Sequence, residues 1–370
     1  MSDLKQRVQD LLALADVQIN GSRPWDIQIK DDRFYQRVFA HGSLGLGESY
    51  MDGWWDVAEL DVMIGKIMSA HLDTKVRTVD LVKDALKARL MNLQSPKRAF
   101  EIGEKHYDVG NDLYERMLGK RMAYTCGYWK NAETLEEAQE AKLDLLCRKI
   151  GLKKGDRVLD IGGGWGSFAG YAAEKYGASV VATTVSKEQV EWGRKRYAGM
   201  PIEFRLQDYR ETNEQFDHVV SVGMVEHVGY KNYRTFMESA WRNLKQGGFF
   251  LLHTIGGNKS VHRTDPWIAK YIFPNSMLPS VAQLARAMEG LFVMEDWHNF
   301  GYHYYLTLRE WFKNFDAGWP ELQVKYGDRF YRMWKYYLLS CAGLFQARQI
   351  QLWQVVMSKG GVKGGYNSIR

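Results

Sequence analysis

The central part of the chain alternates short apolar runs with longer segments of helical periodicity. The apolar runs predict five strands, at Arg157–Ile161, Ser179–Thr184, Ile202–Leu206, Phe216–Val222 and Gly248–Thr254. Apolar residues at helical spacing predict the helices that separate them, at Ser167–Lys175, Lys187–Tyr197 and Tyr233–Asn243. Strands that alternate with helices at this spacing form βαβ units, so the pattern predicts a parallel sheet with helices on both faces.

Two later segments, residues 292–297 and 349–357, alternate apolar and polar positions with a period of two. They predict a terminal hairpin added antiparallel to the sheet. Between them, Leu306–Gln346 is predicted to be a helical insertion.

The first 92 residues predict a separate, small and mainly helical domain. Helical periodicity covers Leu4–Leu14 and Asp61–Ser69, and the glycine-rich segment between them carries Met51, Trp54 and Trp55. These side chains supply either amphipathic surface for lipid contact or the core of the small domain. The polar stretch Asn92–Phe100 is the best linker candidate, so we divide the chain into residues 1–92 and 93–370.

Composition adds a few restrictions. Aromatic residues make up 14% of the 370 residues, which suggests an apolar or cation-lined pocket, and the net charge of +6 suits contact with an anionic surface but also many other enzymes. The three cysteines include no C-x-x-C pair, which argues against a disulfide framework or a structural zinc site and favours a reducing cytoplasm. No apolar run approaches the roughly 20 residues that span a bilayer, so we expect a soluble or peripheral protein.

A cluster of glycines follows the first predicted strand of the sheet. Asp160 lies in that strand, and the turn contains Gly162, Gly163, Gly164 and Gly166 before a helix begins. Such a turn lets backbone approach a ligand closely, at the sheet edge where nucleotide-like ligands bind. Dinucleotide enzymes place an acidic residue at the end of the second strand, but residues 180–186 contain none. A carboxylate at Asp160 suits an amine, which favours S-adenosylmethionine over NAD.

Further polar residues follow the later strands. Asp208 could accept a hydrogen bond from an adenine amino group and Tyr209 could stack on the ring, although Asp208 could equally be a helix cap. Glu226 and His253 come at the ends of the fourth and fifth strands, where both would face the cofactor crevice. We therefore expect them in a catalytic site, and without a Cys/His cluster we expect no catalytic metal.

Several unusual stretches together resemble cyclopropane-fatty-acid-phospholipid synthases over nearly the whole chain. They are GSLGLGESYMDGWW, EKHYDVGNDLY, YTCGYWK, VLDIGGGWGS, LQDYR, SVGMVEHVG, LLHTIG, DPWIAKYIFP, MEDWHNFG and QLWQVV. The resemblance implies an α/β fold of the class I, Rossmann-like methyltransferase type, with a seven-stranded sheet and a lipid-associated N-terminal domain. It implies methylene transfer from S-adenosylmethionine to the cis double bond of an acyl chain in a membrane phospholipid. The alternative is a fatty-acyl methyltransferase that leaves a branched or methylene-bearing chain.

The same resemblance implies roles for individual residues. Bound bicarbonate would be the base that closes the ring, held by Glu226, His253 and Tyr304 with backbone groups of Cys126 and Ile255. The cofactor residues would be Tyr124, Thr125, Asp160, Gly162, Gly163, Gly164, Trp165, Gly166, Thr184, Gln189, Asp208 and Tyr209. A C-terminal cysteine of the family corresponds to Cys341, but an apolar helix around it disfavours a thiolate.

Two departures from the family and several expectations about partners complete the resemblance. Gly163 stands where the family usually has cysteine and Thr125 where it usually has serine; both are small replacements that should leave cofactor binding intact. The family tends to dimerise, and the resemblance implies peripheral contact with the inner face of the membrane from the cytoplasm and no nucleic-acid partner.

Overall fold

The computed structural model of the protein describes residues 2–72 and 110–370. The chain divides into two compact units. Unit 1 combines Met1–Met91 with His262–Pro274 and Tyr304–Ile350, and unit 2 combines Asn92–Val261 with Asn275–His303 and Gln351–Arg370. The predicted linker at Asn92–Phe100 and the predicted boundary after residue 92 lie outside the described residues.

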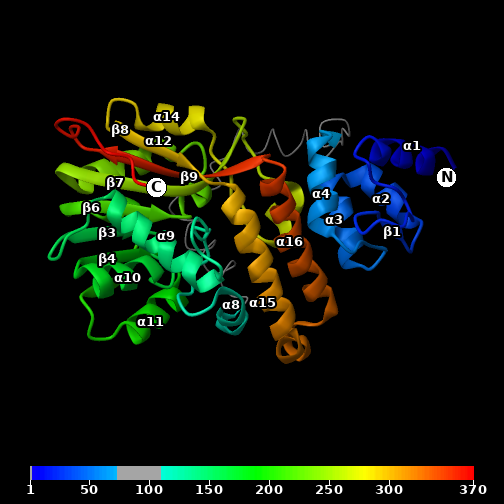
Figure 1. The fold of residues 1–370 in the computed structure, drawn as a ribbon, viewed down its shortest axis with the longest axis horizontal. Coiled ribbons are helices and arrows are strands. Elements are labelled where there is room, and N and C mark those ends of the chain that lie inside the picture. The colour runs from blue at the N-terminus through cyan, green and yellow to red at the C-terminus, as the bar shows by residue number, and fades with distance from the viewer. Residues whose placement is uncertain (1, 73–109) are drawn as a thin grey trace. The chain divides into compact units, whose positions relative to one another are not determined.

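Unit 2 is built on the expected seven-stranded sheet (Figure 1). Its strands are β3 (Arg157–Ile161), β4 (Ser179–Thr184), β5 (Ile202–Leu206), β6 (Phe216–Val222), β7 (Leu244–Gly257), β8 (Val293–Asn299) and β9 (Ile350–Ser358). They lie in the order β5-β4-β3-β6-β7-β9-β8. Strands β3 to β7 pair in parallel and β8 pairs with β9 antiparallel, which confirms the fold class and the terminal hairpin.

Helices cover both faces of this sheet, because both faces of its strands are apolar. One face is covered by α9 (Leu135–Lys149), α10 (Ser167–Tyr176) and α11 (Lys187–Arg196), and the other by α12 (Tyr233–Asn243) and α14 (Val281–Met288) (Figure 1). Two 3₁₀ turns, η1 (Tyr209–Glu211) and η2 (Val225–His227), follow β5 and β6, and α8 (Asn111–Leu118) precedes α9. Thr134 and Glu137 form a capping box at the start of α9.

Unit 1 is mainly helical. It contains α1 (Ser2–Ala13), α2 (Arg33–His41), α3 (Ser43–Met51), α4 (Leu60–Ser69), α13 (Pro266–Tyr271), most of α15 (Tyr302–Tyr326), α16 (Asp328–Gln346) and a two-stranded sheet of β1 (Gln28–Ile29) and β2 (Trp55–Asp56). The predicted helical insertion is two helices, since the backbone at Gly327 has φ +75. Residues 304–350, which contain most of α15 and all of α16, belong to the same compact unit as the N-terminal residues.

The glycine-rich segment of unit 1 is the helix α3, and it contributes to a core. Met51 is 3% exposed and Trp55 is 0% exposed, so the core interpretation is confirmed for these two side chains. The Trp55 indole N–H donates to the Ser49 hydroxyl at 3.0 Å. Trp54 is partly exposed and lies under the guanidinium groups of Arg33 and Arg37.

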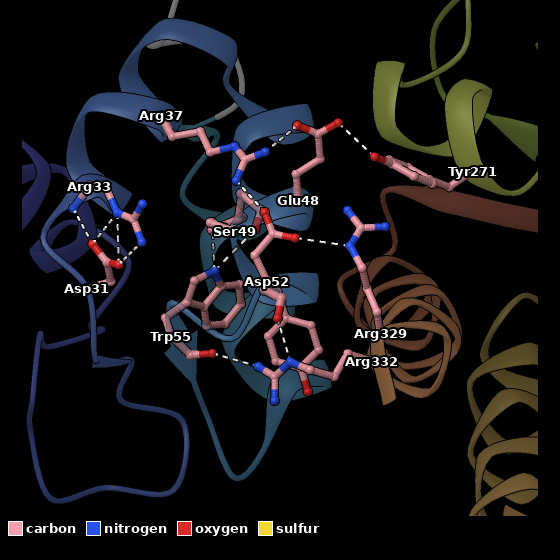
Figure 2. Close-up of polar contacts among 12 residues, drawn as sticks. Asp31, Arg33, Arg37, Glu48, Ser49, Asp52, Trp55, Tyr271, Arg329 and Arg332 are labelled. Atoms are coloured by element: carbon pink, nitrogen blue, oxygen red, sulfur yellow. Dashed lines mark hydrogen bonds and ion pairs between the residues drawn. The ribbon is translucent and has the colours of Figure 1, made fainter. Parts of the chain in front are cut away.

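Polar contacts join the N-terminal elements of unit 1 to its later helices (Figure 2). Glu48 of α3 accepts hydrogen bonds from Arg37 and from the Tyr271 hydroxyl of α13. Arg332 of α16 donates to the backbone carbonyls of Tyr50, at 2.5 Å, and Trp55, at 2.8 Å. These contacts make the N-terminal elements and helices α13 and α16 parts of one structure. No helix among residues 2–72 and 110–370 is both long and apolar enough to cross a bilayer.

Candidate active site

The glycine turn after β3 has the geometry that the sequence predicts. Gly162, Gly164 and Gly166 have φ values of +81, +55 and +83, which side chains rarely adopt. The amides of Gly162 and Gly163 both donate to the Thr183 carbonyl at 3.0 Å, which fixes the turn against β4. A Cβ on Gly164 would meet nothing within 4 Å, so the turn leaves open space on that side.

Gly163 lies close to the neighbouring strand. A Cβ built on it would lie 2.8 Å from the Cβ of Ala182 and 3.1 Å from a carboxylate oxygen of Asp160. A cysteine at this position, as in the resembling family, would therefore need Ala182 to move. Glycine at position 163 has no Cβ and so avoids this close contact with Ala182.

Asp160 is a buried acid in β3, next to the glycine turn. Its side chain is 1% exposed and neither of its oxygens has a hydrogen-bond partner. Burial raises its pKa to about 7, although the nearby ammonium group of Lys142 lowers it in part. A buried carboxyl with both oxygens unpaired, beside a glycine turn, fits a ligand with a cationic donor such as an amino group.

The segment that carries Tyr124, Thr125 and Cys126 is held by two polar side chains of α9. Gln139 donates to the Thr125 carbonyl at 2.8 Å, and the Lys142 ammonium donates to the Thr125 hydroxyl at 2.9 Å. Lys142 is fully buried, and burial lowers its pKa to about 8. The methyl group of Thr125 faces Gly223 at the end of β6, where a Cβ would lie only 2.6 Å from it.

Glu226 lies in η2, just after β6, and His253 lies in β7 beside Val222, the last residue of β6. One carboxyl oxygen of Glu226 accepts the backbone N–H of Ile255 at 2.7 Å, and the other has no partner. The Gly223 amide donates to the carbonyl of His253 at 2.8 Å, which joins the two strand ends. Burial raises the pKa of Glu226 to about 7, so this carboxyl can exchange a proton near neutral pH.

His253 is held neutral. It is 1% exposed, and burial takes its pKa well below the ordinary value, with Lys142 and Lys149 adding to the shift. Its Nε2 atom has no partner, and its Nδ1 lies 3.2 Å from the side-chain amide nitrogen of Gln354. The site therefore offers an unpaired imidazole nitrogen near two buried cations, which suits a small anion.

Four further predicted cofactor residues contact protein neighbours: Thr184, Gln189 and Trp165 are buried, and Tyr124 is partly exposed. The Thr184 hydroxyl donates to the Gln189 side chain at 2.7 Å, and the Trp165 indole donates to Asn111 at 3.1 Å. The ring of Tyr114 lies against those of Trp165 and Tyr124, with centroids 4.9 and 5.3 Å away. These contacts order the surroundings of the glycine turn.

Asp208 is the helix cap that its alternative interpretation describes. Its carboxylate accepts the Arg210 amide at 2.9 Å and pairs with the guanidinium of the same residue at 2.6 Å. Tyr209 is 6% exposed and packs edge-on against Phe236. Contacts of either residue with adenine stay a prediction.

Tyr304 and Cys341 belong to unit 1, whereas the site residues above belong to unit 2. The ring of Tyr304, on α15, packs on Phe345 with centroids 4.6 Å apart. Cys341 lies on α16, where burial and the charge of Asp265 raise the pKa of its thiol to about 12. A thiol of this kind stays protonated at neutral pH, which agrees with the expectation from the apolar helix.

Sequence reasoning missed three buried polar residues, Gln139, Lys142 and Gln354. Each is at most 1% exposed and touches a predicted site residue. Gln139 and Lys142 are three residues apart and lie on the apolar face of α9. Polar residues on an otherwise apolar helix face could have indicated these two residues from the sequence. Within the described part of the chain, no group of three or more His, Cys, Asp or Glu side chains could hold a metal ion.

Comparison with known proteins places this arrangement in a family. The family described as mycolic acid cyclopropane synthetase matches residues 94–355. The cyclopropane-fatty-acyl-phospholipid synthase of Escherichia coli K12 is 54% identical over 358 residues, which cover 96% of this chain and 93% of that protein. A probable fatty acid methyltransferase of Pseudomonas putida is 35% identical over 268 residues, 69% of this chain and 68% of that protein.

Solved structures agree with this assignment. The cyclopropane synthase MmaA2 of Mycobacterium tuberculosis is 30% identical with a TM-score of 0.67, covering 70% of this chain and 98% of that one. The mycolic acid cyclopropane synthase CmaA1, complexed with SAH and CTAB, is 31% identical with a TM-score of 0.66, at the same coverage. The chain therefore belongs to the mycolic acid cyclopropane synthetase family and has the fold of a class I methyltransferase.

Proposed function

We propose that the protein transfers a methylene group from S-adenosylmethionine to the cis double bond of an unsaturated acyl chain in a phospholipid, which forms a cyclopropane ring. The observation that carries this proposal is the set of unpaired, buried polar atoms at the carboxyl ends of β3, β6 and β7, on Asp160, Glu226 and His253. The identity of 54% to a phospholipid-acting synthase over 96% of the chain supports the substrate class.

In this proposal some residues of unit 2 bind the cofactor and others hold the base. The glycine turn and Asp160 hold the methionine part of S-adenosylmethionine, since an unpaired carboxyl suits the ammonium group of an amino acid. The sulfonium of S-adenosylmethionine supplies an electrophilic methyl group. Tyr124, Thr125, Thr184, Gln189, Asp208 and Tyr209 line the remaining cofactor positions.

Ring closure needs a base. The alkene π electrons form a bond to the methyl carbon while the sulfur–carbon bond breaks, and the substrate is left with a positive charge. The transferred carbon must then lose a proton, and the electron pair of the broken carbon–hydrogen bond closes the ring. In our proposal the base would be a bicarbonate held by residues at the ends of β6 and β7. Glu226 would accept its proton, His253 would donate a hydrogen bond to it, and backbone groups of Cys126 and Ile255 would complete its binding.

The proposal extends to the setting of the reaction. The substrate chain lies in a bilayer, so the enzyme works at the membrane surface, with residues 1–92 contributing to membrane contact and with two copies of the chain acting together. Cosedimentation with vesicles and light scattering test the membrane contact and the dimer separately.

One experiment tests the reaction itself. The protein is incubated with methyl-labelled S-adenosylmethionine and vesicles of an unsaturated phosphatidylethanolamine, and the lipids are analysed by mass spectrometry and proton NMR. We expect a lipid that has gained one CH₂ and shows the high-field protons of a cyclopropane ring. A methylene-branched chain has the same mass and keeps an alkene. An alkene signal in the product would therefore favour the fatty-acyl methyltransferase alternative.

A further inference from the structure

Gln354 lies beside the candidate catalytic histidine but has no role in the proposed reaction so far. It belongs to β9, the neighbour of β7 in the sheet, and its side chain is 0% exposed. Its amide nitrogen lies 3.2 Å from Nδ1 of His253. A glutamine buried this completely is expected to satisfy its polar atoms, yet its side-chain oxygen has no partner. The contact between this buried amide and His253 therefore calls for a functional explanation.

The imidazole of His253 is neutral, so its ring carries one N–H proton, on either Nδ1 or Nε2. Lys142 and Lys149 both act electrostatically on His253 and, together with burial, disfavour its protonated form. In a neutral imidazole one nitrogen donates and the other accepts, so the partner of Nδ1 decides which nitrogen carries the proton.

The orientation of the Gln354 amide follows from the atoms left unpaired. With its nitrogen toward His253, the amide donates one N–H to Nδ1 and leaves its second N–H and its carbonyl oxygen without a partner. Rotated by half a turn, it would place its NH₂ group at that partnerless position, and both N–H donors would be buried and unpaired. Buried orphan donors are rarer than under-satisfied carbonyl oxygens, so the donating orientation is favoured.

We propose that Gln354 is a positioning residue that fixes the tautomer of His253, so that its proton is on Nε2 and points at an anion bound in the site. The unpaired Nε2 of His253 is then a hydrogen-bond donor, which suits an oxygen of the bicarbonate in the proposed function on which this inference rests. Phe300 packs edge-on against the same imidazole, with centroids 6.1 Å apart, and limits its rotation.

The tautomer can be read directly in the full-length chain. Proteins labelled with ¹⁵N-histidine give long-range nitrogen–proton correlations that distinguish the two neutral tautomers, and His253→Gln identifies the signal of His253. We expect the native chain to show the Nε2–H form. An Nδ1–H form in the native chain would overturn the proposal.

Two substitutions at position 354 separate positioning from packing. Gln354→Met keeps the length of the side chain but removes the donor, so the Nε2–H preference should be lost and turnover should fall about tenfold with unchanged affinity for S-adenosylmethionine. Gln354→Glu offers an acceptor instead. It should move the proton to Nδ1 and shift the acid limb of the pH–rate profile upward, since a nearby carboxylate favours the imidazolium.

Gln351→Met is the matched control on the same strand. Gln351 is also buried, but its amide contacts Asn258 and Asn299 rather than His253, so the signal of His253 should be unchanged. An unaltered His253 signal in folded Gln354→Met would overturn the positioning role. The proposed function fails by a different result, a lipid product without a ring, which does not alter the tautomer measured in the native chain.

Discussion

At the scale of single residues, the site is marked by polar groups that are buried without partners. Such groups cost stability, and a protein retains them where a ligand pairs with them. The sequence identifies Asp160, Glu226 and His253 because they lie at or just after the ends of predicted strands. The sequence could not show that Asp208 is already paired with Arg210, because that contact depends on the 3₁₀ turn after β5.

Glu226→Gln tests the state of the buried carboxyl through stability. The pKa of Glu226 is raised from 4.5 to about 7, so its favourable contribution is full below pH 4.5 and is lost as the pH rises through 7. Glutamine does not titrate. Between pH 4 and pH 8 the free energy of unfolding of the variant should therefore gain about 3 kcal/mol relative to the native chain, from ~1.4 kcal/mol per pKa unit. Urea unfolding across this pH range measures the difference.

The same variant separates stability from chemistry. Its turnover should fall by about a hundredfold or more, because a lost acid–base group has an effect of this size, while S-adenosylmethionine still binds. A difference in unfolding free energy that is constant with pH would contradict the raised pKa. Full activity in the variant would contradict the role of Glu226 in binding the base.

At the scale of elements, the sheet was predictable and the helical unit was less so. Strands β3 to β6 match their predicted bounds, because buried parallel strands are apolar runs that end at glycines and polar turns. Strand β7 is longer than predicted at both ends, since it runs from Leu244 to Gly257 and contains four glycines. The glycines at positions 45 and 47 of the glycine-rich segment each lie in α3 at a point where another residue comes close.

Helices α4 and α16 of unit 1 pack closely at a glycine, Gly343. A Cβ on Gly343 would lie 2.4 Å from the backbone carbonyl oxygen of Asp61, and backbone cannot move aside as a flexible side chain can. Gly343→Ala should therefore push the helices apart and destabilise the protein by about 1–3 kcal/mol, despite the better helix propensity of alanine. Thermal and urea unfolding measure this loss.

Gly65→Ala is the control in the facing helix. A Cβ on Gly65 would be 3.4 Å from the carbonyl oxygen of Gly343, an ordinary contact. Because alanine favours the helix by up to about 1 kcal/mol, this variant should be as stable as the native chain or more so. Equal losses in the two variants would show that close helix packing is not the reason for glycine at position 343.

At the scale of the whole molecule, the two units do not follow the order of the chain. The sequence predicts an N-terminal domain that ends near residue 92, followed by one catalytic domain. In the structure, residues 262–274 and 304–350 group with the N-terminal residues, so the chain passes between the units repeatedly. Periodicity could not reveal this, because it locates helices along the chain but not the partners against which they pack.

This interleaving makes a prediction about a chain shortened to residues 93–370. The family match covers 94–355, and MmaA2 is matched over 98% of its length by 70% of this chain, so the shortened chain has the extent of a complete relative. Here, however, Arg332 would lose its partners at Tyr50 and Trp55, and α16 would expose the face that Gly343 packs against α4. We expect a lower unfolding midpoint and binding of a hydrophobic dye.

Supplying residues 1–92 as a separate chain provides the control for the shortened protein. If the loss comes from missing partners, coexpression should restore part of the stability and reduce dye binding, because the contacts of unit 1 can form between two chains as within one. A shortened chain that unfolds at the native midpoint and forms the cyclopropane product would contradict this expectation. The N-terminal segment would then be an independent addition to a complete catalytic domain, as the order of the sequence predicts.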